Sequence, residues 1–370
     1  MWQTKGIAKN IKQPLIATYS TKTTIQEWLF PKTIKKLEKG KNKRCFAGIS
    51  SDVTFNSSKP IIYHVPVEKL EEICEDDVLE LSPDGTISKL FDCSSNQNAL
   101  FLTEKCNSCC IMCPQPQVPI DHGNEVMKLL SCIKPEKLRE ICLTGGEPTI
   151  CSNIMEILCK LKNFPNVDPI ILTNGRKFSD IQFTKQFIKN APFNLTYAIP
   201  VYAPIPEVHD QIVGVNGGFN QTIQGIYNLT KYRVPIEIRI VLMKQNINYL
   251  MELAEYIGWN LPMVVHVAFM GMETHGRADS NSEKIWIEPQ DYMELLEKAI
   301  KILHFRDIDV SVYNIPMCLM PKSMYMYNRF SISTWKQAYL FECQACSKKG
   351  ECNGIFTTSK IIPKGIHSMI

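Results

Sequence analysis

The sequence lacks any hydrophobic run long enough to cross a bilayer, since apolar stretches such as residues 264–272 are short. Its first ten residues also contain no apolar signal region. Neither sign of charge is in large excess, because 41 Lys and Arg residues against 37 Asp and Glu residues give a formal net charge of +4. We therefore expect a cytoplasmic protein without membrane contact. Nucleic acid is not a favoured partner, because a Lys-rich run such as residues 32–44 is usually a solvated surface.

The composition is that of an ordinary folded protein, with 45% hydrophobic and 21% charged residues in a chain of 370. Cysteine is the exception, with 15 copies. In a reducing compartment thiols are not expected to form disulfides, so this number points to metal binding or catalysis.

Short apolar runs alternate with helical segments from about residue 99 onward, which predicts βα units around a parallel sheet. Near-continuous apolar runs suit strands that are buried on both faces. The pattern favours an α/β barrel or an open sheet, with helices at 152–164 and 290–303. The expected strands are 99–103, 139–144, 168–173, 195–202, 236–243, 263–270 and 309–314.

Two regions flank the alternating segment. Residues 1–95 are expected to form a small β-containing domain, because the SPDGT sequence at 82–86 is a good turn between two short strands. Residues 96–314 would form the barrel, and residues 315–370 a third, cysteine-rich region. We expect the first domain to dock a substrate or a partner.

The segment CNSCCIMC at 106–113 contains the first cysteine group. Cys106, Cys110 and Cys113 have the spacing Cys-x3-Cys-x2-Cys, and three thiolates can hold three irons of a four-iron cluster while one iron stays open to another ligand. With Cys109 the same segment can also be divided into two Cys-x2-Cys pairs, which would give a closed zinc site. The spacing alone does not separate these interpretations.

The next motif is LTGGEP at 143–148, at the end of the second expected strand. Gly145 and Gly146 allow the backbone to approach a ligand closely. The carboxyl ends of parallel strands are where α/β folds place their sites. The third strand ends similarly, in TNGR at 173–176.

Together the cysteine loop after strand one and GGEP after strand two resemble the signature of the radical S-adenosylmethionine (SAM) superfamily. This resemblance implies a partial (β/α)6 barrel in which Cys106, Cys110 and Cys113 hold a [4Fe–4S] cluster that reductively cleaves SAM to a 5′-deoxyadenosyl radical. It also implies contacts with SAM, made by Met112, Gly145, Gly146, Glu147, Pro148, Thr173, Asn174 and Arg239.

A second cysteine group lies near the C-terminus, where Cys343, Cys346 and Cys352 are expected to be joined by Cys318. Four thiolates can hold an auxiliary iron–sulfur cluster or a structural zinc ion, and the spacing fits both. We favour a second [4Fe–4S] cluster in a protein that already carries one. The cysteines at 142, 151 and 159 are expected to be small core residues.

Several segments between residues 78 and 356, including MGMETHGRA at 270–278 and SISTWK at 331–336, resemble more closely one radical SAM family, the C component of the His-Xaa-Ser system. That resemblance implies maturation of a ribosomally made precursor peptide with His-Xaa-Ser repeats, a partner radical SAM maturase and an electron donor. We expect Trp286, Tyr313 and Trp335 to be core residues. Histidines 209, 266 and 275 are expected to be satisfied by hydrogen bonds, with Asp210 capping a turn.

Two alternatives stay open. The first is a radical SAM enzyme that acts on a small molecule or RNA, because the cysteine loop and GGEP are shared across the superfamily. The second is a zinc-stapled binding protein without enzyme activity, which would leave GGEP and its position at a strand end unexplained.

Overall fold

The computed structural model describes residues 2–22, 32–38, 45–96, 98–261, 263–331 and 336–369. Trp335 and most of the SISTWK segment lie outside these ranges, as do residues 39–44 of the Lys-rich run. Contacts divide the chain into two compact units: Met1–Leu100 with His122–Cys142 and Glu156–Asp168, and Phe101–Asp121 with Leu143–Met155 and Pro169–Ile370. Among the described residues, no helix has the length and hydrophobicity needed to cross a bilayer.

The first unit contains two four-stranded sheets, with the orders β1-β8-β7-β3 and β2-β6-β5-β4. Their strands are β1 (Gln3–Lys5), β2 (Ile7–Lys9), β3 (Leu15–Thr18), β4 (Ile34–Lys36), β5 (Ala47–Ile49), β6 (Ile61–Tyr63), β7 (Val78–Leu81) and β8 (Thr86–Phe91). The predicted turn joins β7 to β8, and Gly85 adopts the left-handed φ of +86° that it requires. The first unit also holds the short helix α2 (Val67–Glu71) and α3 (Gly123–Cys132).

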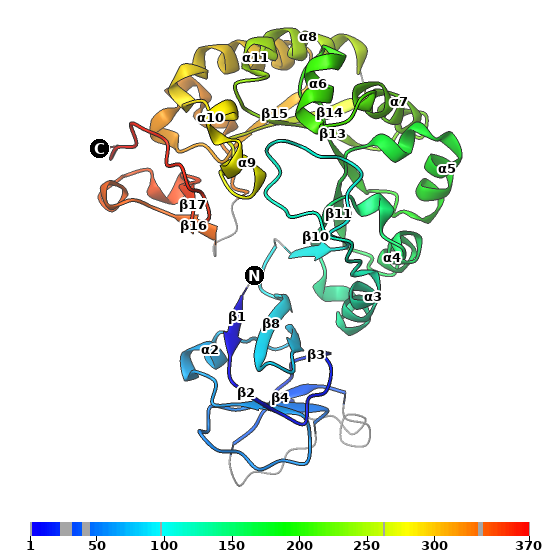
Figure 1. The fold of residues 1–370 in the computed structure, drawn as a ribbon, viewed down its shortest axis with the longest axis vertical. Helices are drawn as coiled ribbons and strands as arrows, with labels where there is room; N and C mark the ends of the chain where they lie inside the picture. Colours follow the sequence, from blue (N-terminus) through cyan, green and yellow to red (C-terminus); the bar gives the residue numbers. More distant parts are fainter. Residues whose placement is uncertain are drawn as a thin grey trace. The chain divides into compact units, whose positions relative to one another are not determined.

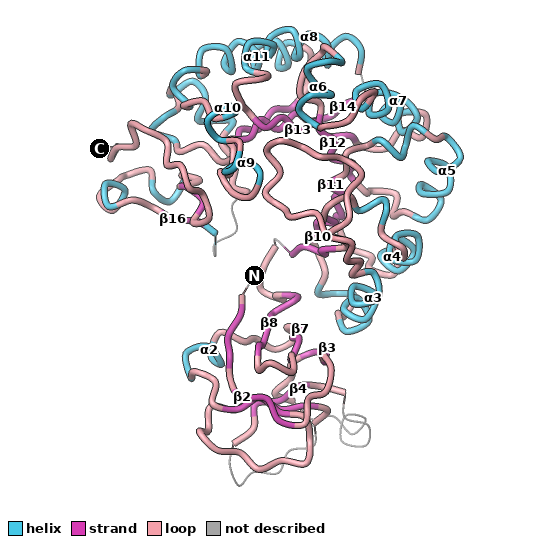
Figure 2. Tube along the Cα trace, viewed as in Figure 1, coloured by secondary structure: helices cyan, strands magenta, loops and turns pink. Residues whose placement is uncertain are grey.

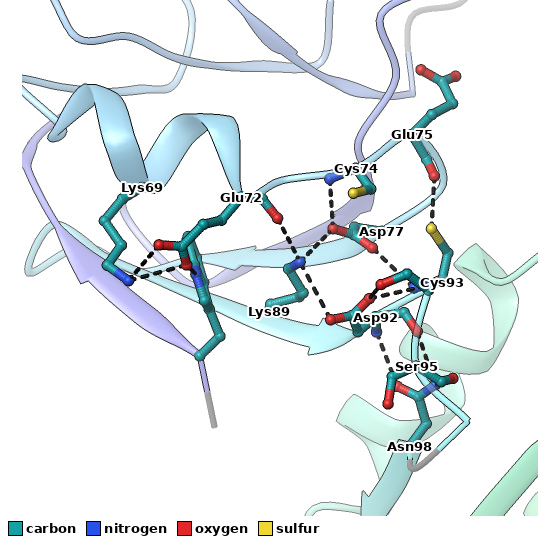
Figure 3. A network of polar contacts seen from close by, with 12 residues as sticks. Lys69, Glu72, Cys74, Glu75, Asp77, Lys89, Asp92, Cys93, Ser95 and Asn98 are labelled. Atoms are coloured by element: carbon teal, nitrogen blue, oxygen red, sulfur yellow. Dashed lines mark hydrogen bonds and ion pairs between the residues drawn. The ribbon is translucent and has the colours of Figure 1, made fainter. Parts of the chain in front are cut away.

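A buried polar network braces the sheet that contains β7 and β8 (Figure 3). Lys89 donates to Asp77 Oδ2 at 2.8 Å and to the carbonyl oxygen of Glu72 at 2.9 Å. Asp77 in turn accepts from the backbone amides of Cys74 and Cys93, at 2.8 and 2.9 Å. The Lys89 ammonium and the Asp77 carboxylate are almost fully buried, and both have hydrogen-bond partners. Their bonds to the backbone of Glu72 and Cys74 hold the segment after α2 against the sheet.

The alternating segment forms a seven-stranded sheet in the order β15-β14-β13-β12-β11-β10-β9, as predicted. Its strands are β9 (Asn98–Phe101), β10 (Glu140–Thr144), β11 (Asp168–Leu172), β12 (Thr196–Pro200), β13 (Ile236–Val241), β14 (Val264–Met270) and β15 (Asp309–Tyr313). The pairs from β11 to β15 are parallel. Because β9 and β15 are its two edges, the sheet is an open, partial barrel and the α/β fold prediction is confirmed.

Helices cover one side of the strands from β11 to β15 (Figures 1 and 2). They are α5 (Ile181–Asn190), α6 (Pro206–Val213), α7 (Gly218–Thr230), α8 (Leu250–Asn260) and α11 (Met293–Phe305), and α4 (Ile154–Leu161) follows β10. Ile236, Ile238 and Ile240 on β13 have no exposed surface. Strand side chains alternate between the two faces, so Glu237 and Arg239 point to the other side of the sheet.

Of the three cysteines expected to be core residues, one is buried. Cys151 is buried and Cys142 on β10 is half-buried, but Cys159 on α4 is exposed to solvent although its neighbours Ile157 and Leu158 are fully buried. The helical stripe explains this difference, since residue 159 falls between the apolar positions. All fifteen cysteines lie in the described ranges and all are free thiols.

Candidate active site

The loop at 106–113 lies on the side of the curved sheet opposite the helices of the second unit (Figure 1). Its backbone is tied to the end of α6, because the amide of Cys109 donates to Val213 O at 2.8 Å and that of Ile111 donates to Ile212 O at 2.9 Å. The helix end therefore fixes the path of the cysteine loop.

Three thiols of this loop are close neighbours. Burial, followed by the nearby Cys113 and Cys106 thiols, raises the pKa of Cys110 to about 12. Burial also raises the pKa of Cys106 to about 11, against a backbone hydrogen bond from Ser108 that lowers it. Such thiols stay protonated until a metal ion displaces the protons. Within the described ranges, no three His, Cys, Asp or Glu side chains form a complete metal site, so proximity and burial alone support this ligand set.

Cys109 differs from its three neighbours. Its thiol is exposed and lies 3.6 Å from Gln117 Oε1. Hydrogen bonding to Cys109 is also the largest cause that raises the pKa of Arg277. Cys109 therefore faces Gln117 and Arg277, an arrangement that favours the Cys-x3-Cys-x2-Cys interpretation over two paired zinc-binding motifs.

Gly145 and Gly146 pack against the segment that leads into the loop. Gly146 N–H donates to Thr103 O at 2.7 Å, and Glu147 N–H donates to Lys105 O at 2.8 Å. Gly145 has φ +149°, and a Cβ at either glycine would overlap a backbone carbonyl oxygen, of Thr103 or of Lys105. The glycine pair thus permits the close approach of two backbones, directly before Cys106.

The Glu147 carboxylate is 1% exposed and fully engaged. Oε1 accepts from Thr149 N at 3.1 Å, from Thr149 Oγ1 at 2.6 Å and from Thr173 Oγ1 at 2.6 Å, while Oε2 accepts from Asn174 N at 2.7 Å. Glu147 therefore joins the end of β10 to the end of β11. Pro148 begins the short 3-10 helix that follows and is also buried.

The loop after β11 holds the cysteine loop from a second direction. Asn174 Nδ2 donates to Asn107 Oδ1 at 2.6 Å, and Arg176 donates to Ser108 Oγ at 3.1 Å and to the backbone oxygen of Asn107. Gln221 of α7 accepts from Arg176 Nε at 2.7 Å. Residues 174 and 176 of the TNGR segment thus meet residues 107 and 108 of the cysteine loop.

The two remaining residues expected to contact SAM lie in different surroundings. Met112 is buried in an apolar cluster that includes Tyr202, Ile212 and Met243. Arg239 donates from Nε to Glu237 Oε1 at 2.5 Å and has a quarter of its side chain exposed.

The second cysteine group converges in space. Cys318, which lies in a 3-10 helix directly after β15, lines one solvent-open pocket of about 380 Å³ together with Cys343, Cys346 and Cys352. Backbone amides point at two of the sulfur atoms: Met317 N–H lies 3.3 Å from Cys352 Sγ, and Met369 N–H lies 3.4 Å from Cys346 Sγ. Four thiols with amide donors suit a tetrathiolate iron–sulfur or zinc centre.

Sequence reasoning missed several residues that shape the cysteine loop. Gly214 has φ +68°, and a Cβ there would lie 2.7 Å from Cys109 O; Gly276 has φ +61°, and its Cβ would lie 2.6 Å from Pro114 O. Asn281 donates to Ile111 O at 2.8 Å. These residues lie 100 to 175 positions from the loop in the sequence, so no local pattern links them to it. The isolated Gly214 and Gly276 were the only sequence signals for a close backbone approach.

Asp210 accepts from the amides of Gly217 and Phe219, at 2.5 and 2.7 Å, which confirms that it caps a turn. Trp286 packs against the apolar cluster around Met112 but is only partly buried, so it is not the core residue that was expected. His209 and His266 both have hydrogen-bond partners. Tyr313 is only half-buried, so it is not the core residue that was expected.

Comparison with curated proteins finds similarity over part of this chain and part of each relative. The probable GTP 3′,8-cyclase of Thermococcus kodakarensis is 28% identical over 150 residues, which cover 39% of this chain and 47% of that protein. The GTP 3′,8-cyclase of Petrotoga mobilis is 24% identical over 205 residues, covering 53% of this chain and 61% of that protein. The chain thus spans about half the length of these two relatives.

Among solved structures, Streptococcus suis SuiB bound to its precursor peptide SuiA is similar with a TM-score of 0.48 and 14% identity, covering 67% of this chain and 55% of that one. The structure named anSMEcpe, with AdoMet and the Cp18Cys peptide, has a TM-score of 0.44 and 16% identity, covering 57% and 62%. Residues 100–257 match the family model of the radical SAM superfamily. These residues, which contain the cysteine loop, GGEP and the strands from β10 to β13, therefore match the radical SAM superfamily, a class of enzymes whose cofactors are a [4Fe–4S] cluster and SAM.

Proposed function

We propose that Cys106, Cys110 and Cys113 hold the [4Fe–4S] cluster. The observation that carries this proposal is the contrast between three neighbouring thiols and the outward-facing Cys109. When bound, the cluster supplies the electron that cleaves SAM reductively and so starts radical chemistry on a substrate.

The chain's own residues position and shield this site. Gly145 and Gly146 seat the segment before Cys106, while Asn174 and Arg176 hold residues 107 and 108. The Glu147 carboxylate keeps the ends of β10 and β11 together. Backbone groups at 145–147, with Met112, Thr173, Asn174 and Arg239, are the proposed surroundings of SAM.

We further propose that Cys318, Cys343, Cys346 and Cys352 hold an auxiliary [4Fe–4S] cluster. Support comes from their shared pocket and from the amide hydrogens directed at Cys346 and Cys352. Four protein ligands close such a centre, so it has no open position for a substrate.

For the substrate we propose a ribosomally made precursor peptide with His-Xaa-Ser repeats, modified together with a partner radical SAM maturase and an electron donor. The support is the sequence resemblance between residues 78 and 356, which extends beyond the shared radical SAM segment. Residues 1–95, which contain the two small sheets, are the proposed docking part for the peptide or the partner.

Mass spectrometry of the precursor peptide after anaerobic coexpression tests this substrate. The peptide should change mass with the wild-type chain and with Cys159→Ala, whose exposed thiol lies outside both cysteine groups. It should stay unchanged with Cys106→Ala. An unmodified peptide in the presence of active wild-type enzyme contradicts the substrate proposal.

A small-molecule substrate is the second candidate, because the curated relatives over part of the chain are GTP 3′,8-cyclases. Incubating the reconstituted protein with SAM, a reductant and GTP distinguishes the two. Consumption of GTP favours this candidate, and its full recovery while SAM is cleaved favours the peptide.

A further inference from the structure

A row of polar side chains crosses three neighbouring strands of the partial barrel. The row consists of Glu237 and Arg239 on β13, His266 on β14, and Ser311 and Tyr313 on β15; apart from the exposed Asp309 at the start of β15, the other residues of these strands are apolar. Glu237 and His266 are direct cross-strand partners. Burying such groups in a sheet is costly compared with apolar residues of similar size, so packing alone does not explain the row.

The contacts along the row form one continuous chain. His266 Nδ1 lies 2.8 Å from Glu237 Oε2, and His266 Nε2 lies 2.8 Å from Ser311 Oγ. The other Glu237 oxygen accepts from Arg239, and Ser311 is hydrogen-bonded to Tyr313. Because a carboxylate can only accept, Nδ1 donates to Glu237, and in the neutral imidazole Nε2 then accepts from the Ser311 hydroxyl.

The row faces the side of the sheet that carries the cysteine loop. Burial raises the pKa of Tyr202, the Cys110 and Cys113 thiols raise it further, and Arg239 lowers it. Tyr202 thus lies within electrostatic reach of both the cysteine loop and Arg239. A fifth of the His266 side chain and a quarter of the Arg239 side chain are exposed, and Ser311 beside His266 is 5% exposed, so the row is open to solvent mainly at His266 and Arg239.

We propose that Ser311, His266 and Glu237 form a proton relay that removes a proton from a hydroxyl or imidazole group of the bound substrate. The donor atom gives its proton to Ser311 Oγ and keeps the electron pair, while the Ser311 proton passes to His266 Nε2. The Glu237 carboxylate stabilises the resulting imidazolium. The inference rests on the proposed peptide substrate, since serine and histidine are the side chains that a His-Xaa-Ser repeat offers.

Ser311→Ala is the most informative variant, because it breaks the relay and leaves the pair of His266 and Glu237 intact. His266→Gln removes the base, and Ser311→Thr restores a hydroxyl. His304→Gln, at an exposed position of α11, is the matched control. The charged and titratable groups around His266 are Glu237 and Arg239 on β13, Tyr313 on β15, and Asp309, its strand partner.

The readout is modified peptide formed per 5′-deoxyadenosine released. Ser311→Ala and His266→Gln should lower this ratio about 100-fold without lowering 5′-deoxyadenosine release, and Ser311→Thr should recover it. His304→Gln should match the wild type.

Two outcomes overturn the relay, and they are distinguishable. Wild-type ratios in both Ser311→Ala and His266→Gln would show that the row is only structural, while the peptide assignment stands. If the wild type releases 5′-deoxyadenosine and modifies no peptide, the proposed function fails and the relay fails with it.

Discussion

At the scale of single residues, Gly145 and Gly146 determine how closely the cysteine loop approaches the end of β10. A Cβ on Gly146 would overlap the Lys105 carbonyl oxygen, a backbone atom that cannot rotate away. Gly146→Ala should therefore lower the free energy of unfolding by about 1–3 kcal/mol and reduce iron loading. Urea unfolding and iron analysis check this. Gly350→Ala, where a Cβ meets nothing within 4 Å, is the control. Equal behaviour of the two variants would show that the close approach is not required.

His209 makes stability depend on pH. Desolvation by burial lowers its pKa from 6.5 to about 4, against the Asp210 charge, which raises it. The unfolded chain binds a proton near pH 6.5 while the folded chain does not, so stability falls as the pH drops from 6.5 towards 4. This one residue should cost about 2 kcal/mol at pH 5 relative to pH 7. Urea unfolding of His209→Gln should lack that part of the slope, and the exposed His304→Gln should keep it.

At the scale of elements, the end of α6 acts as a support for the cysteine loop. Gly214 and Gly217 both adopt left-handed φ, of +68° and +73°. A Cβ on Gly214 meets Cys109, whereas one on Gly217 meets nothing within 4 Å. Gly214→Ala and Gly217→Ala should therefore share the same backbone strain, about 1 kcal/mol, and only Gly214→Ala should also impair cluster loading. The 400 nm absorbance after reconstitution compares them; equal absorbance would exclude the support role.

The strands were predictable because their apolar runs are set locally, by burial on both faces. All seven expected strands of the large sheet lie where the sequence places them, within three residues at each end. The small sheets of the first unit were not predictable in detail, since most of their strands are three or four residues long. Contacts between distant residues, such as Glu147 with Thr173 or His266 with Ser311, depend on strand register and leave no local pattern.

At the scale of the whole molecule, the account requires two metal centres in one chain. Anaerobically reconstituted wild type should bind about eight irons, and Cys318→Ala should bind about four, because one of two four-iron clusters is lost. Metal and sulfide analysis checks this. A content of four irons and one zinc in the wild type would assign the second cysteine group to zinc and correct the proposal for that group.

The central claim concerns which thiols of residues 106–113 hold the cluster that cleaves SAM. The most direct measurement is 5′-deoxyadenosine released from SAM by the anaerobically reconstituted and reduced protein, compared between Cys109→Ala and Cys110→Ala. The account predicts product with Cys109→Ala at a level near that of the wild type, and none with Cys110→Ala. Product from Cys110→Ala, or its absence from the wild type, would contradict the account.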